Sequence, residues 1–146
     1  MNQPNVIDKK SSMQAAMYYS NSDIRLIDQP IPTIGPGEIL VKVYSSGICG
    51  TDVMEWYRLK KGPRVLGHEI AGEVIESQND KFHVGERVFV SHHVPCNSCR
   101  YCLAGHHTAC ETLHTGNYDP GGYAEYIRVP KLNVNLGTYL LADHVS

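Results

Sequence analysis

The sequence has no excess of charge of either sign and no long apolar run, and both absences narrow what the chain can bind. It carries 13 Lys and Arg residues against 15 Asp and Glu residues, for a formal net charge of -2. Proteins that bind nucleic acid or a membrane surface typically carry a basic patch or excess. No apolar run approaches the roughly 20 residues that a membrane-spanning helix needs. We therefore expect neither nucleic acid nor a membrane as a partner.

Three further signals are missing from the chain. Residues 1–12 are polar and lack the apolar core of a secretory signal, so we expect a flexible amino-terminal arm and a cytoplasmic protein. No internal repeat or low-complexity segment is present. No Gly-x-Gly-x-x-Gly motif follows a predicted strand, and strands do not alternate with helices. We therefore expect no nucleotide-binding domain within these 146 residues.

Short β-rich segments fill residues 13–146 and predict one mainly β domain. Turn residues such as Gly, Pro, Asn and Asp separate these segments. Residues 51–58 lack a helix breaker and predict a short helix, with Thr51 or Asp52 as its cap. Many short strands at close spacing, with one predicted helix, favour a partly open antiparallel β-barrel with few short helices. The predicted strands are residues 14–20, 23–28, 38–46, 67–76, 87–91, 122–129 and 132–136, with a loop over 60–64.

Four of the five cysteines lie within fifteen residues, in the pattern Cys96-x2-Cys99-x2-Cys102-x7-Cys110. A cytosolic chain keeps its thiols reduced, which favours a metal over disulfides. Four thiolates at close spacing are typical of a closed, tetrahedral structural zinc site. We therefore predict a structural zinc in a lobe spanning residues 95–113. Zinc binding would supply the folding energy that so polar a lobe lacks.

Other uses of these cysteines stay open from the spacing alone. They could be free or oxidised thiols in a loop. An iron–sulfur cluster is disfavoured because no proline follows Cys110 and the third gap is long. A nucleic-acid-binding zinc module would want a basic helix beside the metal, and Arg100 is the only Lys or Arg in the lobe.

Three motifs precede the lobe and one follows it, at ordered spacing. They read GICGTD from residue 47, GHEIAG from residue 67, GERV from residue 85 and GGYAEY from residue 121. Together with the cysteine lobe, they resemble the zinc-containing alcohol dehydrogenases of the medium-chain dehydrogenase/reductase superfamily. The resemblance is nearest to the sorbitol and threonine dehydrogenase-like branch and covers residues 13–146. It implies the GroES-like catalytic domain of such an enzyme.

The resemblance also implies roles for four residues. Cys49 and His68 are similar to the first two ligands of the catalytic zinc. Glu69 resembles the acid beside the metal, which orients water or binds zinc transiently, and Thr51 resembles the hydroxyl that contacts the substrate and starts the proton relay. A catalytic zinc with an open position activates a secondary alcohol for hydride transfer to NAD or NADP. The implied substrate is a small alcohol or polyol, and full-length family members are homo-oligomers.

The chain departs from the family pattern in ways that affect its chemistry. The third catalytic ligand lies beyond residue 146 in the family pattern, so we expect the lobe zinc to be retained and the catalytic zinc to be partial or absent. A histidine often stands five residues after the ligand cysteine, but this chain has Met54, whose thioether cannot carry a proton. With no nicotinamide-binding domain, we expect the chain to be inactive alone.

The competing interpretation is a non-catalytic zinc-binding GroES-like module with a structural or interaction role. The motifs around Cys49 and His68 argue against it, because a structural module has no need for a second, open metal site. Weaker candidates for the cleft are His92, His93, Trp56 and Tyr57, for which surface, hydrogen-bonding or packing roles are the alternative.

Overall fold

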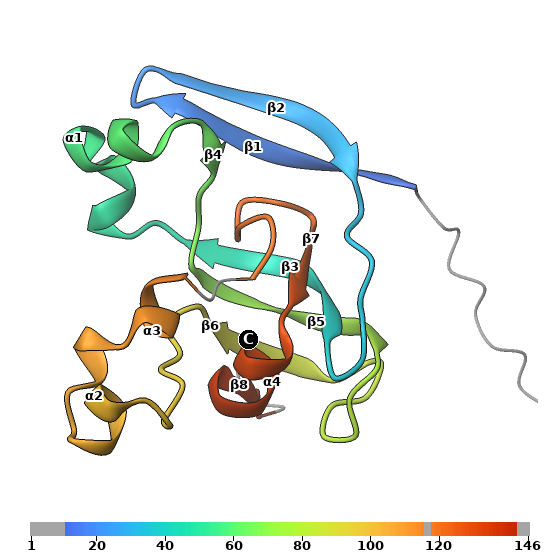
Figure 1. Cartoon of the computed structure of the whole chain (residues 1–146). Coiled ribbons are helices and arrows are strands. Elements are labelled where there is room, and N and C mark those ends of the chain that lie inside the picture. Colours follow the sequence, from blue (N-terminus) through green and yellow to red (C-terminus); the bar gives the residue numbers. More distant parts are fainter. Residues whose placement is uncertain (1–10, 116–117, 143–146) are drawn as a thin grey trace, which may run out of the picture.

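Two antiparallel sheets form most of the structure, a computed structural model that describes residues 11–115 and 118–142. The strands are β1 (Ser12–Ser20), β2 (Asp23–Pro30), β3 (Ile39–Gly47), β4 (Arg64–Val65), β5 (Glu69–Ser77), β6 (Arg87–Ser91), β7 (Tyr126–Val129) and β8 (Thr138–Leu140). The smaller sheet has the order β2-β1-β4 and the larger one β7-β3-β5-β6-β8. Figure 1 shows the β1–β2 hairpin lying above the larger sheet.

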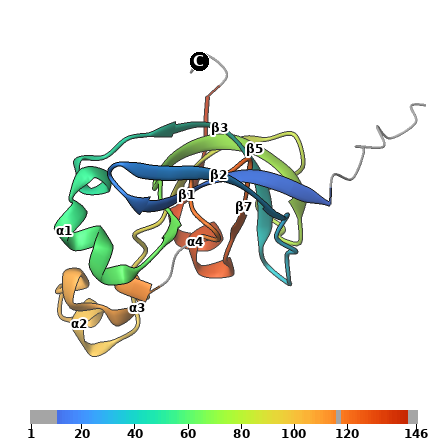
Figure 2. The same cartoon turned by 90° about the horizontal axis from the view of Figure 1, so that it is seen from above.

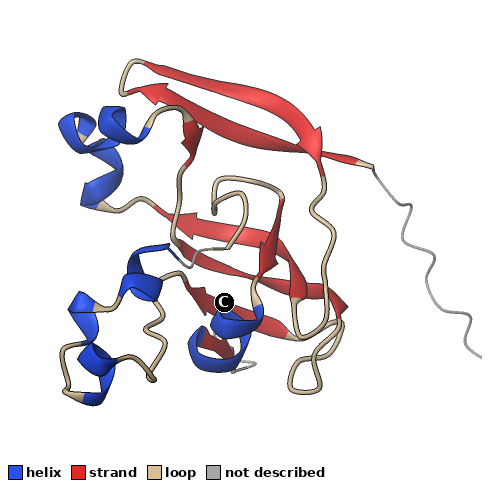
Figure 3. Cartoon of the chain, in the orientation of Figure 1, coloured by secondary structure: helices blue, strands red, loops and turns tan. Residues whose placement is uncertain are grey.

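Short helices join and flank the strands. They are η1 (Gly50–Val53), α1 (Glu55–Arg58), η2 (Leu59–Lys61), α2 (Arg100–Leu103), η3 (His107–Ala109), α3 (Glu111–Thr115) and α4 (Lys131–Gly137). Figure 3 shows that the turns around α1 and those of the cysteine lobe lie on the same side of the molecule. In the turned view of Figure 2, the lobe with α2 and α3 projects away from the sheets. In the described ranges, no helix has both the length and the apolar character that crossing a bilayer requires.

The main core lies on one face of the larger sheet. Burial alternates along β5 and β6, so Ile70, Val74, Val88 and Val90 are all fully buried or nearly so. This period of two is the reason that these residues form strands with one face in the core. A smaller cluster around Met13 packs the hairpin sheet onto the rest. The prediction of a mainly β domain with few short helices is confirmed, and the sheets stay open rather than closing into a barrel.

The strand predicted over residues 132–136 is wrong, because these residues belong to helix α4. Pro130 stands at the N-cap, and its carbonyl accepts a hydrogen bond from Val134 N at 2.9 Å. Asn133 is 1% exposed and donates through Nδ2 to Ser91 O at 3.0 Å. Burying Asn133, Val134 and Gly137 on one side requires helical spacing. A tertiary contact therefore overrides an alternating local pattern.

Other boundaries also differ from those predicted. The helix over 51–58 is broken at Met54, whose ψ of 77° is not helical. Part of the loop predicted over 60–64 contributes to β4, which pairs with β1. Over 122–129 only β7 is a strand, because the residues before it cross between the sheets. There Tyr123 N donates to Leu66 O, and Tyr123 O accepts from Ala16 N. Of the predicted arm, residues 1–10 lie outside the described ranges, and β1 begins at Ser12.

Candidate functional site

The four lobe cysteines converge on one point. Their sulfur atoms all lie within 4.8 Å of one another. Cys96 Sγ lies 4.0 Å from Cys102 Sγ and 3.6 Å from Cys110 Sγ. Four sulfurs bound about 2.3 Å from a central zinc would lie about 3.8 Å apart. The set of donors, completed by Cys99, therefore fits a tetrahedral zinc.

Hydrogen bonds and burial prepare these thiols unequally. Ser98 N and Cys99 N donate to Cys96 Sγ at 3.5 Å and 3.3 Å. Hydrogen bonds from Ser98, followed by the one from Cys99, lower the pKa of Cys96 to about 5. Burial raises the pKa of Cys102 to about 12. Cys96 is thus ready to bind as a thiolate, whereas ionised Cys102 needs a nearby cation to offset its lost hydration.

Cys49, His68 and Glu69 form a second cluster, whose ligand atoms also lie within 4.8 Å of one another. Strands β3 and β5 pair with Gly47 opposite Glu69, so the chain just after β3 meets the start of β5. A Cβ on Gly47 would lie 2.5 Å from Glu69 Oε2, so glycine leaves room for that carboxylate. A thiolate, an imidazole and a carboxylate are all ligands that zinc accepts. The cluster fits a zinc with three protein ligands.

Asp52 contacts both Cys49 and His68. It is 5% exposed. Its Oδ2 accepts hydrogen bonds from Cys49 N at 3.1 Å and from Tyr123 Oη at 2.8 Å. Its Oδ1 lies 3.5 Å from His68 Nδ1 and 3.0 Å from Arg58 Nη2. With Nδ1 directed at a carboxylate, His68 has its Nε2 free for a metal.

Arg58 links Asp52 to Thr51. Besides the ion pair with Asp52, its Nη2 donates to Thr51 Oγ1 at 3.1 Å, and its Nε donates to Thr51 O at 2.8 Å. The hydroxyl oxygen of Thr51 is therefore engaged on one side by a fixed cation. The position five residues after Cys49 holds Met54, so Arg58 is the polar group that contacts Thr51 here.

One pocket of about 630 Å³ gathers the four residues predicted to act together. Cys49, Thr51, His68 and Glu69 all line it, and the lobe cysteines are not among its lining residues in the described part of the chain. The structure therefore separates a closed four-thiol cluster from an open, pocket-facing one. This is the arrangement expected for one structural and one catalytic metal.

Comparison with known proteins identifies the family of this chain. Residues 35–136 match the family described as the alcohol dehydrogenase GroES-like domain. The chain belongs to this family. It is 38% identical over 135 residues to an L-threonine 3-dehydrogenase of Rhizobium etli (strain CIAT 652), a match that covers 85% of this chain and 39% of the relative. The chain thus spans about two fifths of the length of the curated relatives it matches.

Solved structures of related proteins share this GroES-like fold. Galactitol-1-phosphate dehydrogenase from Escherichia coli matches with a TM-score of 0.73 and 31% identity, over 92% of this chain and 39% of that one. Acetophenone reductase from Geotrichum candidum NBRC 4597, solved in complex with NAD, matches with a TM-score of 0.73 and 29% identity. That match covers 93% of this chain and 42% of the reductase.

Of the four residues that the sequence suggested less strongly for the cleft, some line the pocket and one lies on the surface. His92, His93 and Tyr57 line the pocket, whereas Trp56 is 63% exposed and is not among its lining residues. The rings of His92 and His68 have centroids 4.6 Å apart. Burial, followed by the charges of His93 and His68, lowers the pKa of His92 to about 4, so His92 is neutral near pH 7.

The sequence analysis considered Asp52 only as a helix cap and did not predict its contacts with Cys49 and His68. Cys49, not Asp52, stands at the N-cap of η1, and Asp52 is the third residue of the turn. The available signal was the spacing of three residues between Cys49 and Asp52. In a helical turn, a carboxylate at the third position can accept a hydrogen bond from the backbone N–H of the N-cap residue. Nothing in the sequence indicated that Arg58 and Tyr123 would contact Asp52.

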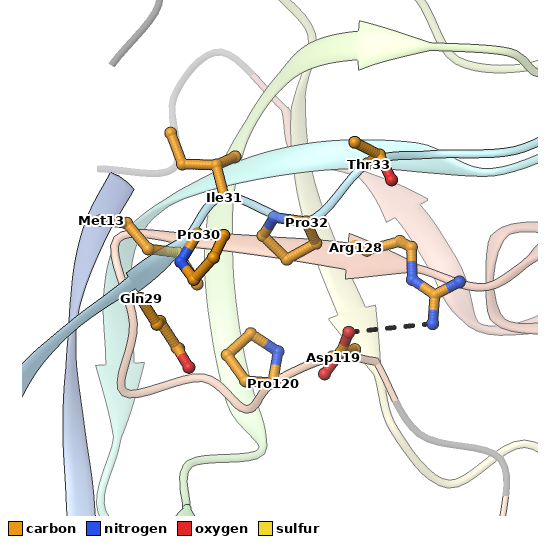
Figure 4. A pocket seen from close by; sticks show the side chains of 9 residues that line it. All are labelled: Met13, Gln29, Pro30, Ile31, Pro32, Thr33, Asp119, Pro120 and Arg128. Atoms are coloured by element: carbon orange, nitrogen blue, oxygen red, sulfur yellow. Dashed lines mark ion pairs between the residues drawn. The ribbon is translucent and has the colours of Figure 1, made fainter. Parts of the chain in front are cut away.

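A second pocket, of about 490 Å³, lies between the end of β2 and the loop at Asp119. Prolines form much of its wall, and Figure 4 shows Arg128 facing Asp119 across it. These two groups lie 3.8 Å apart, and Arg128 also contacts Glu38 at 3.4 Å. Its charged groups are paired, and it contains no cluster of metal ligands among the described residues, so it offers no metal site like the one at Cys49 and His68.

Proposed function

We propose that this chain is the zinc-carrying part of an oxidoreductase that transfers hydride between a secondary alcohol and NAD or NADP. The observation that supports it is the meeting of Cys49, Thr51, His68 and Glu69 in one open pocket. L-threonine 3-dehydrogenase and galactitol-1-phosphate dehydrogenase, to which the chain is similar, are both named as dehydrogenases of small hydroxyl compounds. The substrate class is therefore a small alcohol or polyol.

In this proposal Cys49, His68 and Glu69 hold a zinc that, when bound, supplies Lewis acidity to the alcohol oxygen. Asp52 holds His68 by its Nδ1 side and Cys49 by its backbone N–H. Thr51 accepts a hydrogen bond from the substrate hydroxyl through the lone pair that Arg58 leaves free, and as it takes that proton it passes its own hydroxyl proton to water in the open pocket. A bound nicotinamide would accept the hydride from the carbon that bears this hydroxyl, so the alcohol would become a carbonyl compound.

The lobe has a different role in the proposal. Its four thiols would bind a structural zinc that leaves no position for substrate. The lobe zinc should bind more tightly than the pocket zinc, since the pocket offers three ligands, one of them the exposed carboxylate of Glu69. Because hydride transfer needs a bound nicotinamide, we expect no NAD(P)-dependent alcohol oxidation from the 146-residue chain alone.

Elemental analysis of zinc per chain tests the proposal on the wild type and on Cys49→Ser. We expect more than one zinc per chain at saturating zinc, falling to one in Cys49→Ser. One zinc at every concentration, unchanged by Cys49→Ser, would contradict zinc binding by Cys49, His68 and Glu69 alone and would mean that the pocket needs the further ligand of the family pattern. No zinc in a folded chain would overturn the lobe assignment as well.

A further inference from the structure

Basic residues line one side of the site pocket. Its lining residues include Arg58, Lys61 and Arg64, whereas Glu69 is the only Asp or Glu among those that the structure describes. The three cations come from one stretch of chain, from the end of α1 through η2 to β4. Figure 1 shows this stretch, in green, running from α1 to β4, from which the chain continues into β5.

Arg58 is already neutralised, but the other two cations are not. Arg58 Nη2 lies 3.0 Å from Asp52 Oδ1. In the described ranges no carboxylate lies within ion-pair distance of Lys61 or Arg64. Lys61 and Arg64 therefore line the pocket without a carboxylate partner among the described residues.

Internal contacts hold both side chains in place. The Arg64 guanidinium donates to the carbonyls of Lys61 and Gly62. Lys61 Nζ lies 4.6 Å from the centroid of the Tyr57 ring, and its hydrogen bond lowers the pKa of Tyr57. Since holding a flexible cation costs conformational entropy, two side chains already held lose less when a ligand binds them.

We infer that Lys61 and Arg64 bind an anionic group of the substrate, a carboxylate or a phosphate, while its secondary hydroxyl reaches Thr51. This rests on the proposed function of the same pocket. An anion would gain charge-assisted hydrogen bonds from both cations, which are about twice as strong as neutral ones. A neutral polyol would offer neither cation a counter-charge. The substrate class is therefore narrower than alcohols in general.

The neighbouring Lys60 supplies a matched control. It lies in the same helical turn, and its Nζ lies 5.4 Å from the Trp56 ring, but it is not among the lining residues of the pocket. Lys60→Gln removes one positive charge from the same stretch without touching the pocket wall. Lys61→Gln and Arg64→Gln remove one charge each from the wall.

Isothermal titration calorimetry of the zinc-loaded chain tests the inference with two pairs of probes. L-threonine is compared with L-threoninol, which lacks the carboxylate, and sorbitol 6-phosphate is compared with sorbitol. We expect at least one anionic probe to bind about tenfold or more tightly than its neutral partner. The pair that shows the difference identifies the anion as carboxylate or phosphate.

Lys61→Gln and Arg64→Gln should each abolish most of that preference, and Lys60→Gln should keep it. Equal affinity within both pairs, no binding by any probe, or an equal loss in Lys60→Gln would overturn the inference. Zinc per chain is measured on the same samples. A normal pocket zinc with no anion preference would sink this inference alone, whereas loss of the pocket zinc would count against the proposed function.

Discussion

Asp52 Oδ1 lies 3.5 Å from His68 Nδ1, while the other oxygen of the same carboxylate accepts a hydrogen bond from Cys49 N at 3.1 Å. One buried carboxylate thus positions two residues that are nineteen apart in the sequence. Arg58 and Tyr123 satisfy its remaining hydrogen-bonding capacity. This network holds the open metal cluster in a fixed geometry before any ligand arrives.

Asp52→Asn should weaken zinc binding in the pocket and leave the lobe unchanged. Carboxylates that orient a metal-binding histidine typically contribute about 10- to 100-fold in metal affinity, so we expect a loss of that size. Competition with a chromophoric chelator measures it. Asp23→Asn, which removes an exposed carboxylate paired with Arg25, is the control. Equal affinity in Asp52→Asn and the wild type would contradict the prediction.

Gly67→Ala should destabilise the fold more than Gly62→Ala does. Both glycines have positive φ, 87° and 73°, which costs roughly 1–2 kcal/mol for an L-residue. A Cβ at residue 67 would also lie 2.7 Å from Tyr123 N, whereas one at residue 62 meets nothing within 4 Å. Urea unfolding measures both free energies. Equal losses would show that the backbone around Tyr123 adjusts freely.

Tyr118 and Tyr123 should resist ionisation in the folded chain. Burial is the first cause that raises the pKa of each, and for Tyr123 its hydrogen bond to Asp52 follows. A raised pKa means that the unfolded state loses the proton first. This contribution to stability is therefore complete below about pH 10 and decreases as the pH rises further.

Urea unfolding at about pH 9 and about pH 11 tests this sign. Stability should fall across that interval in the wild type, and the fall should be smaller in Tyr118→Phe. Tyrosinate absorbance measured before unfolding should show the same two groups titrating late. If the free energy of unfolding falls by the same amount in Tyr118→Phe, Tyr118 does not contribute to this pH dependence.

The lobe should unfold locally when its zinc is removed, while the sheets persist. Among residues 95–113 only Cys102 and Cys110 are buried, so the lobe has almost no apolar core without the metal. Hydrogen exchange of amides after chelation should rise sharply in α2 and η3 and remain slow in β3 and β5. Cys102→Ser should reproduce this pattern and Cys49→Ser should not. Slow exchange in a metal-free lobe would contradict it.

Local patterns predicted the features that depend on residues close together in sequence. The spacing of the cysteines from Cys96 to Cys110 predicted a four-thiol cluster, because one short loop can bring those sulfurs together. The β-rich run at residues 67–76 predicted β5, because burial of one strand face has a period of two. Cys49 and His68 were found through motifs, and the structure brings them together with Glu69.

Only the tertiary structure decided which distant residues support the site. The pattern at residues 132–136 alternates like a strand, but burying Asn133 against Ser91 O requires a helix. Nothing local distinguishes Lys61, which lines the pocket, from Lys60, which does not. A sequence motif identifies functional residues that lie within a few positions of one another. Which side chains line the pocket depends instead on the register of β3 on β5 and on the path of the chain before β7. Those are long-range contacts, and their free energies do not appear in any short stretch of sequence.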